Sequence, residues 1–309
     1  MELNKDVKEH GSVSFPPVYE KVSSLSKLYK RRYYTITKLM VLLLVTVPIL
    51  LFFTTFFLSI GYIYSGQAFG IASVVLLTFS LILEIIISNY NFAKKWQICR
   101  SVSETIKREN WFFWMGTDSY PTTDHNLSIH RLIEAERELI MKLTNNNIII
   151  EVSKNNEFVP EDSEKWRELD FIQKWNIYRS KRQQDQIDWY AGQASLNREL
   201  RKKYFTISVV LMVLSFASAI VVIFLLGQYI EVTDVLIAST LATKTYTTAK
   251  QFDYLEFTYA NTSLSLATLR DSTNHMDEVN KKNLLELVNN VENTISREHE
   301  VWIIKTLLK

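Results

Sequence analysis

This chain is poor in cysteine and glycine. Its single cysteine, Cys99, excludes an intrachain disulfide and any cysteine-rich metal site. Only 7 glycines occur among 309 residues, and the sequence contains no phosphate-binding loop, dinucleotide fingerprint or nucleophile elbow. None of the histidines forms a pair of the H-E-x-x-H type, and His130 and Glu134 are spaced as ordinary surface neighbours on a helix. We therefore expect no enzyme, no cofactor and no catalytic or metal-binding residue.

The chain also lacks a strong excess of one charge. Lys+Arg number 35 and Asp+Glu number 33, which gives a formal net charge of +2. This balance argues against nucleic acid as the main partner. The charges are nevertheless placed unevenly, because residues 39–83 and 205–230 contain none. Such long uncharged stretches are typical of membrane proteins.

The uncharged stretches are long enough to cross a bilayer, since about 20 apolar residues span roughly 30 Å of hydrocarbon as a helix. The first stretch contains Pro48, which is expected to kink it. Ser65–Gln67 is typical of a turn, and the span that follows contains one carboxylate, Glu84. The last segment is short and polar, but Lys244 within it can reach the interface from near a helix end. The predicted spans are about 39–63, 68–87, 205–226 and 232–250.

The sequence repeats itself after a shift of 171 residues. Basic, aromatic segments run into the first and third spans, and a module of basic collar plus membrane hairpin occurs twice. The sequence therefore predicts an all-α membrane protein with two repeated hairpins and helical extensions in the cytoplasm. Clustered positive charges beside a span favour anionic lipid by about 1 kcal/mol each. The membrane-interface collar comprises Lys30, Arg31, Arg32, Arg201, Lys202 and Lys203.

Positive charges flank the predicted spans on one side only. Lysines and arginines precede the first and third spans and follow the second and fourth. The turns inside the two hairpins carry none, and Glu231 and Asp234 accompany the second turn. The positive-inside rule then places both termini and the middle of the chain in the cytoplasm.

The remaining segments are expected to be helical and to lie outside the membrane. The predicted regions are a polar tail over 1–18, a first two-span module over 19–147, a hinge over 148–170 and a second two-span module over 171–309. Helices are expected to about Lys107, over about Ser128–Leu143, from about Glu164 into the third span, and from about Asp277 onward. The last helix carries an apolar stripe that fits packing within the chain or a contact between copies. The stripe comprises Leu284, Val288, Val291 and Ile295.

Two features within the predicted spans are candidates for a pore or a gate. A carboxylate in lipid is costly. Glu84 therefore either serves a conduction path opposite the kink at Pro48 or lies close enough to the cytoplasmic face to reach water or Lys38. A row of threonines in the fourth span either lines a pore or bonds helices together. This row comprises Thr240, Thr243 and Thr247. A chain with four spans encloses little space, so any pore requires oligomers.

Motif residues in both halves carry a family resemblance. An Arg…Gln-x-x-Trp-Tyr run precedes the third span and a Glu-His…Trp run closes the last helix. These residues are Arg182, Gln186, Trp189, Tyr190, Glu298, His299 and Trp302. With the collar, the hairpin and Trp96 of the first half, they resemble tandem SLATT domains. These are two-transmembrane effectors associated with SMODS nucleotidyltransferases and SLOG sensors in bacterial conflict systems.

The resemblance implies a function. The family is proposed to form pores in the bacterial inner membrane, or otherwise to damage it, once a sensor module triggers it. No sensor segment is recognisable in this sequence, so the resemblance implies a separate sensor protein, with nucleotide signalling as one route, and a homo-oligomer in the lipid bilayer. Two alternatives stay open. One is a membrane anchor or scaffold that recruits cytoplasmic partners, and the other is a small repeat-built transporter, for which Glu84 would be typical.

Overall fold

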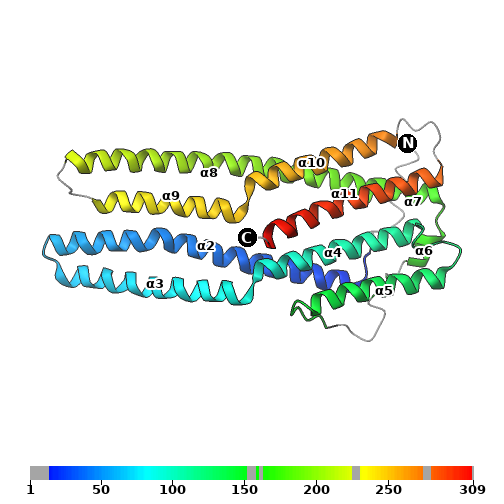
Figure 1. The fold of residues 1–309 in the computed structure, drawn as a ribbon, viewed down its shortest axis with the longest axis horizontal. Helices are drawn as coiled ribbons and strands as arrows, with labels where there is room; N and C mark the ends of the chain where they lie inside the picture. Colours follow the sequence, from blue (N-terminus) through cyan, green and yellow to red (C-terminus); the bar gives the residue numbers. More distant parts are fainter. Residues whose placement is uncertain (1–13, 152–157, 160–162, 225–229, 274–279, 308–309) are drawn as a thin grey trace. The chain divides into compact units, whose positions relative to one another are not determined.

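Helices and short connections make up the described part of the chain, which contains no strand (Figure 1). The computed structural model describes residues 14–151, 158–159, 163–224, 230–273 and 280–307, and the side chains among them except those of 230–231 and 299–307. The all-α prediction is therefore confirmed for these residues. The helices are α2 (Pro17–Ser59), α3 (Ile63–Tyr90), α4 (Phe92–Met115), α5 (His125–Thr144), α6 (Ser163–Glu168), α7 (Phe171–Tyr178), the π-helix η1 (Arg179–Gln184), α8 (Asp185–Phe224), α9 (Ile230–Lys250), α10 (Phe252–Ser272) and α11 (Lys281–Leu307).

Three helical stretches of the described residues are long and apolar enough to cross a membrane: Pro17–Ser59, Ile63–Met115 and Phe171–Phe224. They contain α2, α3 and α8, which hold the first three predicted spans, so the chain is a membrane protein. The fourth candidate, α9, is not among them. Its 21 residues would extend about 31 Å as a helix, and its serines, threonines and lysines lower its mean hydropathy.

The chain divides into two compact units. The polar unit comprises Met1–Lys30, Ala93–Gln193 and Thr258–Lys309, and the membrane unit comprises Arg31–Phe92 and Ala194–Phe257. The membrane unit holds the apolar parts of α2, α3 and α8 together with α9. The polar unit holds α4–α7, η1 and α11 with the ends of the longer helices.

In the membrane unit α2 and α3 pack as an antiparallel pair. The Phe57 and Phe69 rings stack with their centroids 5.4 Å apart. The chain reverses at Gly61, which has a φ of +86° that suits glycine. The turn predicted at Ser65–Gln67 is therefore wrong, because these residues lie inside α3. A Cβ atom at Gly66 would lie 2.6 Å from Leu58 Cγ, so this glycine allows close packing of the two helices.

The helices α8 and α9 also lie side by side and antiparallel in the membrane unit. Ser218 and Thr233 share a hydrogen bond of 2.8 Å between their hydroxyls. Nearer the other end, the rings of Tyr204 and Tyr246 lie 5.1 Å apart. Because α9 begins at Ile230, Asp234 lies within the helix rather than in the turn where the sequence placed it.

The core of the polar unit joins α2, α4 and α5. It is formed by Val18, Val22, Ile98, Cys99, Val102, Ile106, Leu143 and Ile148. The helix expected to end near Lys107 continues to Met115, because Trp111, Phe113 and Trp114 all point into the interior. It ends where Gly116 takes a φ of +69°. The predicted stripe on α11 is confirmed as an interior face, since Leu284, Val288, Val291 and Ile295 are all buried within the chain.

The long charged helix expected from about Glu164 is interrupted twice. The short α6 ends at Glu168, and Asp170 then caps α7 with a capping box that includes Gln173. The next residues, Arg179–Gln184, form the π-helix η1 before α8 begins. Part of the predicted hinge, namely 152–157 and 160–162, lies outside the described residues.

Candidate functional site

A buried ion pair on η1 forms the centre of the candidate site in the polar unit. Arg182 donates from Nε to Glu292 Oε1 at 2.9 Å and from Nη2 to Glu292 Oε2 at 2.8 Å. Tyr178 donates its hydroxyl to Glu292 Oε1 at 3.0 Å. Short π-helical segments frequently mark functional sites, and this one turns both Arg182 and Gln183 into the interior. The arrangement holds α7, η1 and α11 together with directional, charge-assisted bonds.

A second cluster, built by other motif residues, also includes α11 and joins it to α8 and α4. Tyr190 on α8 donates its hydroxyl to Glu298 Oε2 on α11 at 3.2 Å. Arg100 on α4 lies 3.6 Å from the same carboxylate oxygen. The guanidinium of Arg100 also lies 5.9 Å from the centre of the Trp189 ring, within cation–π range. We name the contacts of Arg100, Glu104, Tyr178, Arg182, Tyr190, Glu292 and Glu298 the ion network.

The ion network joins the two halves of the sequence crosswise. Arg100 of the first half pairs with Glu298 of the second, and Glu104 of the first half pairs with Arg182 of the second at 3.6 Å. Arg100 and Glu104 are four residues apart on α4, so they share one face of that helix. Each half therefore supplies one positive and one negative partner to the other.

Opposite charges keep the two arginines of the ion network protonated. Burial alone would lower the pKa of Arg182, but the charges of Glu292 and Glu104 outweigh it and raise the pKa above its usual value. Burial also lowers the pKa of Arg100, and Tyr259 and Glu298 reverse that effect. Burial and the charge of Glu292 raise the pKa of Tyr178 well above its usual value. Both arginines and Tyr178 therefore stay protonated over the physiological range.

A buried carboxyl group on α5 lies beside a second acid. Glu136 is fully buried, and Asn110 donates from Nδ2 to its Oε1 at 2.7 Å. Burial raises the pKa of Glu136 to about 9, the nearby charge of Glu109 adds to the rise, and the Asn110 bond opposes it. Glu109 itself accepts hydrogen bonds from Tyr120 and Arg108. Glu136 is therefore uncharged at neutral pH.

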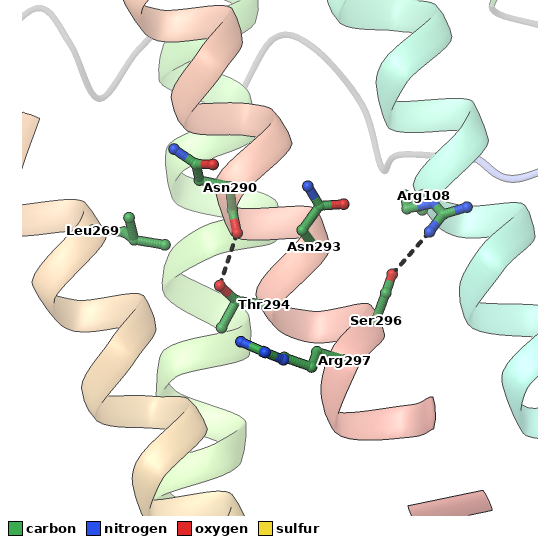
Figure 2. Close-up of a pocket in the computed structure, with 7 residues that line it drawn as sticks. All are labelled: Arg108, Leu269, Asn290, Asn293, Thr294, Ser296 and Arg297. Atoms are coloured by element: carbon green, nitrogen blue, oxygen red, sulfur yellow. Dashed lines mark hydrogen bonds between the residues drawn. The ribbon is translucent and has the colours of Figure 1, made fainter. Parts of the chain in front are cut away.

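A polar groove of about 520 Å³ crosses the outer face of α11. Figure 2 shows Asn290, Asn293 and Arg297 on α11, with Leu269 on one side and Arg108 on the other. Arg108 donates from Nη1 to Ser296 Oγ at 3.1 Å, which fastens α4 to α11 at the edge of the groove. Amide, hydroxyl and guanidinium groups line the groove with a single aliphatic side chain, so it is a polar surface rather than an apolar pocket.

The structure places the collar residues on the exposed surface of α2 and α8. In the membrane unit, Arg201 lies 2.7 Å from Glu256 and 3.3 Å from Asp253, while Arg198 lies 3.0 Å from Glu256. Glu256 thus binds two arginines and ties α8 to α10. Exposed pairs of this kind contribute about 0–1 kcal/mol each. Elsewhere in the collar, Lys30 lies 5.5 Å from the centre of the Trp96 ring and Arg32 lies 6.0 Å from that of Phe92, within cation–π range.

Glu84 is exposed on α3, six residues before the helix ends at Tyr90. Gly66 faces Leu58 and Gly70 faces Thr54, and continuing this antiparallel register brings Glu84 level with about Met40. That position is about two turns away from Pro48. This register places Glu84 closer to Lys38 than to Pro48, which favours the alternative in which Glu84 reaches water or Lys38.

The threonine row of α9 lies partly within the membrane unit. Thr240, Thr243 and Thr247 are half-buried. Their hydroxyls donate to backbone carbonyls of α9 at Leu236, Ser239 and Lys244. These donors are used within the helix, as is common for threonine in membrane helices.

Among the motif residues, the structure brings Arg182, Tyr190 and Glu298 into the ion network, with Trp189 over Arg100. Gln186 is half-buried on α8 and takes no part in it. The side chains of His299 and Trp302 lie outside the described residues. Sequence reasoning missed Arg100, Glu104 and Glu292. The i, i+4 spacing of an arginine and a glutamate on α4 was the available signal, but the same spacing is common on solvated helix faces.

Comparison with known families finds a match for each half of the chain. Residues 178–302 match the SMODS and SLOG-associating 2TM effector domain 1. Residues 18–127 match a family described as a protein of unknown function, DUF4231. The second half is therefore similar to SLATT domains, and the first half matches a different family, so the tandem arrangement of SLATT domains is not what the comparison supports. No curated protein and no solved structure matches the chain.

The SLATT match covers the residues that build the ion network from the second half. It begins at Tyr178, which bonds Glu292, and includes Arg182, Tyr190 and Glu298. The DUF4231 match includes Arg100 and Glu104, the partners from the first half. The ion network thus joins the two matched segments.

Proposed function

We propose that this protein is a membrane-perturbing effector of a bacterial defence system, which oligomerises and forms a pore when a separate sensor protein triggers it. The observation that carries the proposal is the match of residues 178–302 to a two-transmembrane effector domain. The described helices agree with such a role, because three of the helical stretches are long and apolar enough to cross a membrane. The effector acts without catalysis.

The proposal includes four spans in two hairpins, with both termini in the cytoplasm of the cell. The antiparallel contact of α9 with α8 supports the fourth span, as does a helix length of about 31 Å. The order of elements supports the duplication: a long helix, a returning helix and two further helices occur as α2–α5 and again as α8–α11. The exposed basic collar supports the orientation.

The ion network is the proposed link between the trigger and the membrane. It holds α4 to α11 and to η1, which leads directly into α8, through ion pairs that depend on this arrangement of the helices. Buried ion pairs add little net stability, but separating the partners leaves a buried charge without its counter-charge, which is costly. A partner that binds the polar unit and separates these pairs would let α8 move relative to α2, because both helices continue into the membrane unit.

Membrane potential is the decisive measurement. Induced expression of the full chain in cells loaded with a voltage-sensitive dye should depolarise the membrane within minutes. The matched control is the same chain with Val213→Glu, which places a charge in the middle of the apolar part of α8 and costs about 2.5–3.5 kcal/mol of insertion energy. A scaffold would leave the potential unchanged in both. A transporter would depolarise only in the presence of its solute, and either result would contradict the pore.

A further inference from the structure

The outward face of α9 differs from that of its neighbour α8 in the membrane unit. Apart from Val232 in the first turn, the exposed residues of α9 recur every three or four positions and form a single stripe. We call it the α9 stripe; it comprises Asp234, Ile237, Leu241, Lys244, Thr245 and Thr248. The apolar part of α8, in contrast, exposes residues such as Val213, Phe216 and Val221 and no charged residue. The α9 stripe is therefore more polar than the exposed face of the apolar part of α8.

The depth of Asp234 decides what the α9 stripe can face. The Ser218–Thr233 bond sets the register, so Asp234 lies level with about Ala217 of α8. That residue lies seven positions before Phe224, about 10 Å along the helix, and Phe205 begins the apolar segment about 18 Å away on the other side. If α8 crosses the membrane, Asp234 lies well inside the hydrocarbon, which is about 30 Å thick.

A carboxylate at this depth is not stable against lipid. It costs about 2.5–3.5 kcal/mol, and aspartate is too short to reach the interface as a lysine can. Lys244, in contrast, lies level with about Ile207, near the collar. Its long side chain can reach the interface from there. The described residues offer Asp234 no ion-pair partner, so water or another chain must meet it.

We propose that the α9 stripe lines a water-filled path between copies of this chain, with Asp234 as a ring of negative charge that favours cations. Rings of carboxylates select cations, and hydrophobic constrictions gate by excluding water. Ile237 and Leu241 lie one and two turns from Asp234 on the same stripe and form such a constriction. The inference rests on the proposed pore and names its lining. Thr240, Thr243 and Thr247 are half-buried beside the α9 stripe, and their hydroxyls bond to backbone carbonyls of α9.

Cysteine accessibility tests the lining directly. Single cysteines at Asp234, Ile237 or Leu241, in full-length Cys99→Ser chain, are exposed to a small water-soluble thiol reagent in intact cells. All three positions should react, whereas Thr243→Cys on the inner side and Val213→Cys on the lipid side of α8 should not. Reaction at least tenfold faster at the three stripe positions than at Val213 is the expected result. Equal rates at Ile237 and Val213 would overturn the lining.

Ion selectivity tests whether the charge of Asp234 sets the cation preference. In planar bilayers under a salt gradient, Asp234→Asn should shift the reversal potential towards zero by lowering cation preference several-fold. Glu138→Gln, which removes an exposed carboxylate from α5 in the polar unit, should leave it unchanged. Depolarisation in cells with an unreactive α9 stripe would overturn the inference but leave the pore. If the α9 stripe reacts but no conductance is found, the proposed pore is overturned. The α9 stripe would then be a water-exposed face only.

Discussion

Arg182 and Glu292 form a buried two-point ion pair between the π-helix η1 and α11, with bonds of 2.9 and 2.8 Å. The two residues are 110 positions apart in the sequence. Their side chains are 3% and 0% exposed, so neither charge reaches water if the other is removed. Removing only one of the two residues is therefore costly.

Removing one partner of this pair should be far more damaging than removing both. Arg182→Ala leaves a buried, unpaired carboxylate, which costs about 3–5 kcal/mol and should lower the Tm of the purified full chain in detergent by about 10 °C. The double substitution Arg182→Met with Glu292→Leu buries no charge. Its Tm should therefore fall much less than that of Arg182→Ala. Arg198→Ala breaks an exposed pair and serves as the control, with a loss below about 1 kcal/mol. A double variant as unstable as Arg182→Ala would contradict this account.

The protonation of Glu136 should make the stability of the polar unit depend on pH. The pKa of Glu136 is about 9 in the folded chain and 4.5 in its ordinary state. Between these values the unfolded chain releases a proton that the folded chain keeps. The stabilising contribution is therefore complete below pH 4.5, and it falls by up to about 1.4 kcal/mol per pH unit as the pH rises towards 9.

Glu136→Gln should remove this dependence, because glutamine is neutral at every pH and keeps the bond from Asn110. Tm measured between pH 5 and pH 9 should fall more steeply for the natural chain than for the variant. Glu138→Gln, an exposed neighbour on α5, should keep the natural slope. Parallel curves for the natural chain and Glu136→Gln would show that Glu136 is already ionised.

The sequence predicted the parts of this fold that depend on local pattern. The absence of charge from 39–83 and 205–230 located three apolar helices, and the spacing of Leu284, Val288, Val291 and Ile295 gave the buried face of α11. Turn positions were harder to predict from the sequence. Gly61 and Gly66 are both glycines in an apolar segment, and only the φ of +86° at Gly61 and the contact of Gly66 with Leu58 distinguish the turn from the packing site.

The ion network was beyond sequence reasoning for a different reason. Its pairs join residues 78 to 198 positions apart, such as Glu104 with Arg182 and Arg100 with Glu298. One sequence contains no spacing rule for contacts of that range. The π-helix that turns Arg182 inward was equally hidden, because residues 179–184 have an ordinary helical composition.

Close packing of α2 and α3 should depend on Gly66. Gly66→Ala places a methyl group 2.6 Å from Leu58 Cγ and should destabilise the pair by about 1–3 kcal/mol. Gly192→Ala is the matched control, because nothing lies within 4 Å of the added atom. Alanine also favours a helix over glycine by about 1 kcal/mol, so this control should raise Tm. A lower Tm for Gly192→Ala than for Gly66→Ala would refute the packing role.

The membrane topology can be tested with cysteine labels in the Cys99→Ser background. Gln67 near the start of α3 and Gln228 between α8 and α9 should react with a membrane-impermeant reagent added to intact cells. Thr144 on α5 and Lys282 on α11 should react only after the cells are opened. Cys99 is buried, and burial raises the pKa of its thiol to about 12, so background labelling should be low even without the substitution. Labelling of Lys282 from outside would mean that α9 does not cross.

Glu84 should behave as an interfacial charge rather than a gate. It is exposed and lies three residues before Ile87, which ends the apolar run of α3, so only about 5 Å of helix separates it from the polar end. Glu84→Gln should therefore give the same toxicity curve as the natural chain at pH 6 and at pH 8. Val75→Glu is the contrast, since it puts the same side chain on an exposed position deeper in α3, where a carboxylate costs about 2.5–3.5 kcal/mol and should reduce insertion. A shifted toxicity threshold or altered ion selectivity for Glu84→Gln would return this residue to the conduction path.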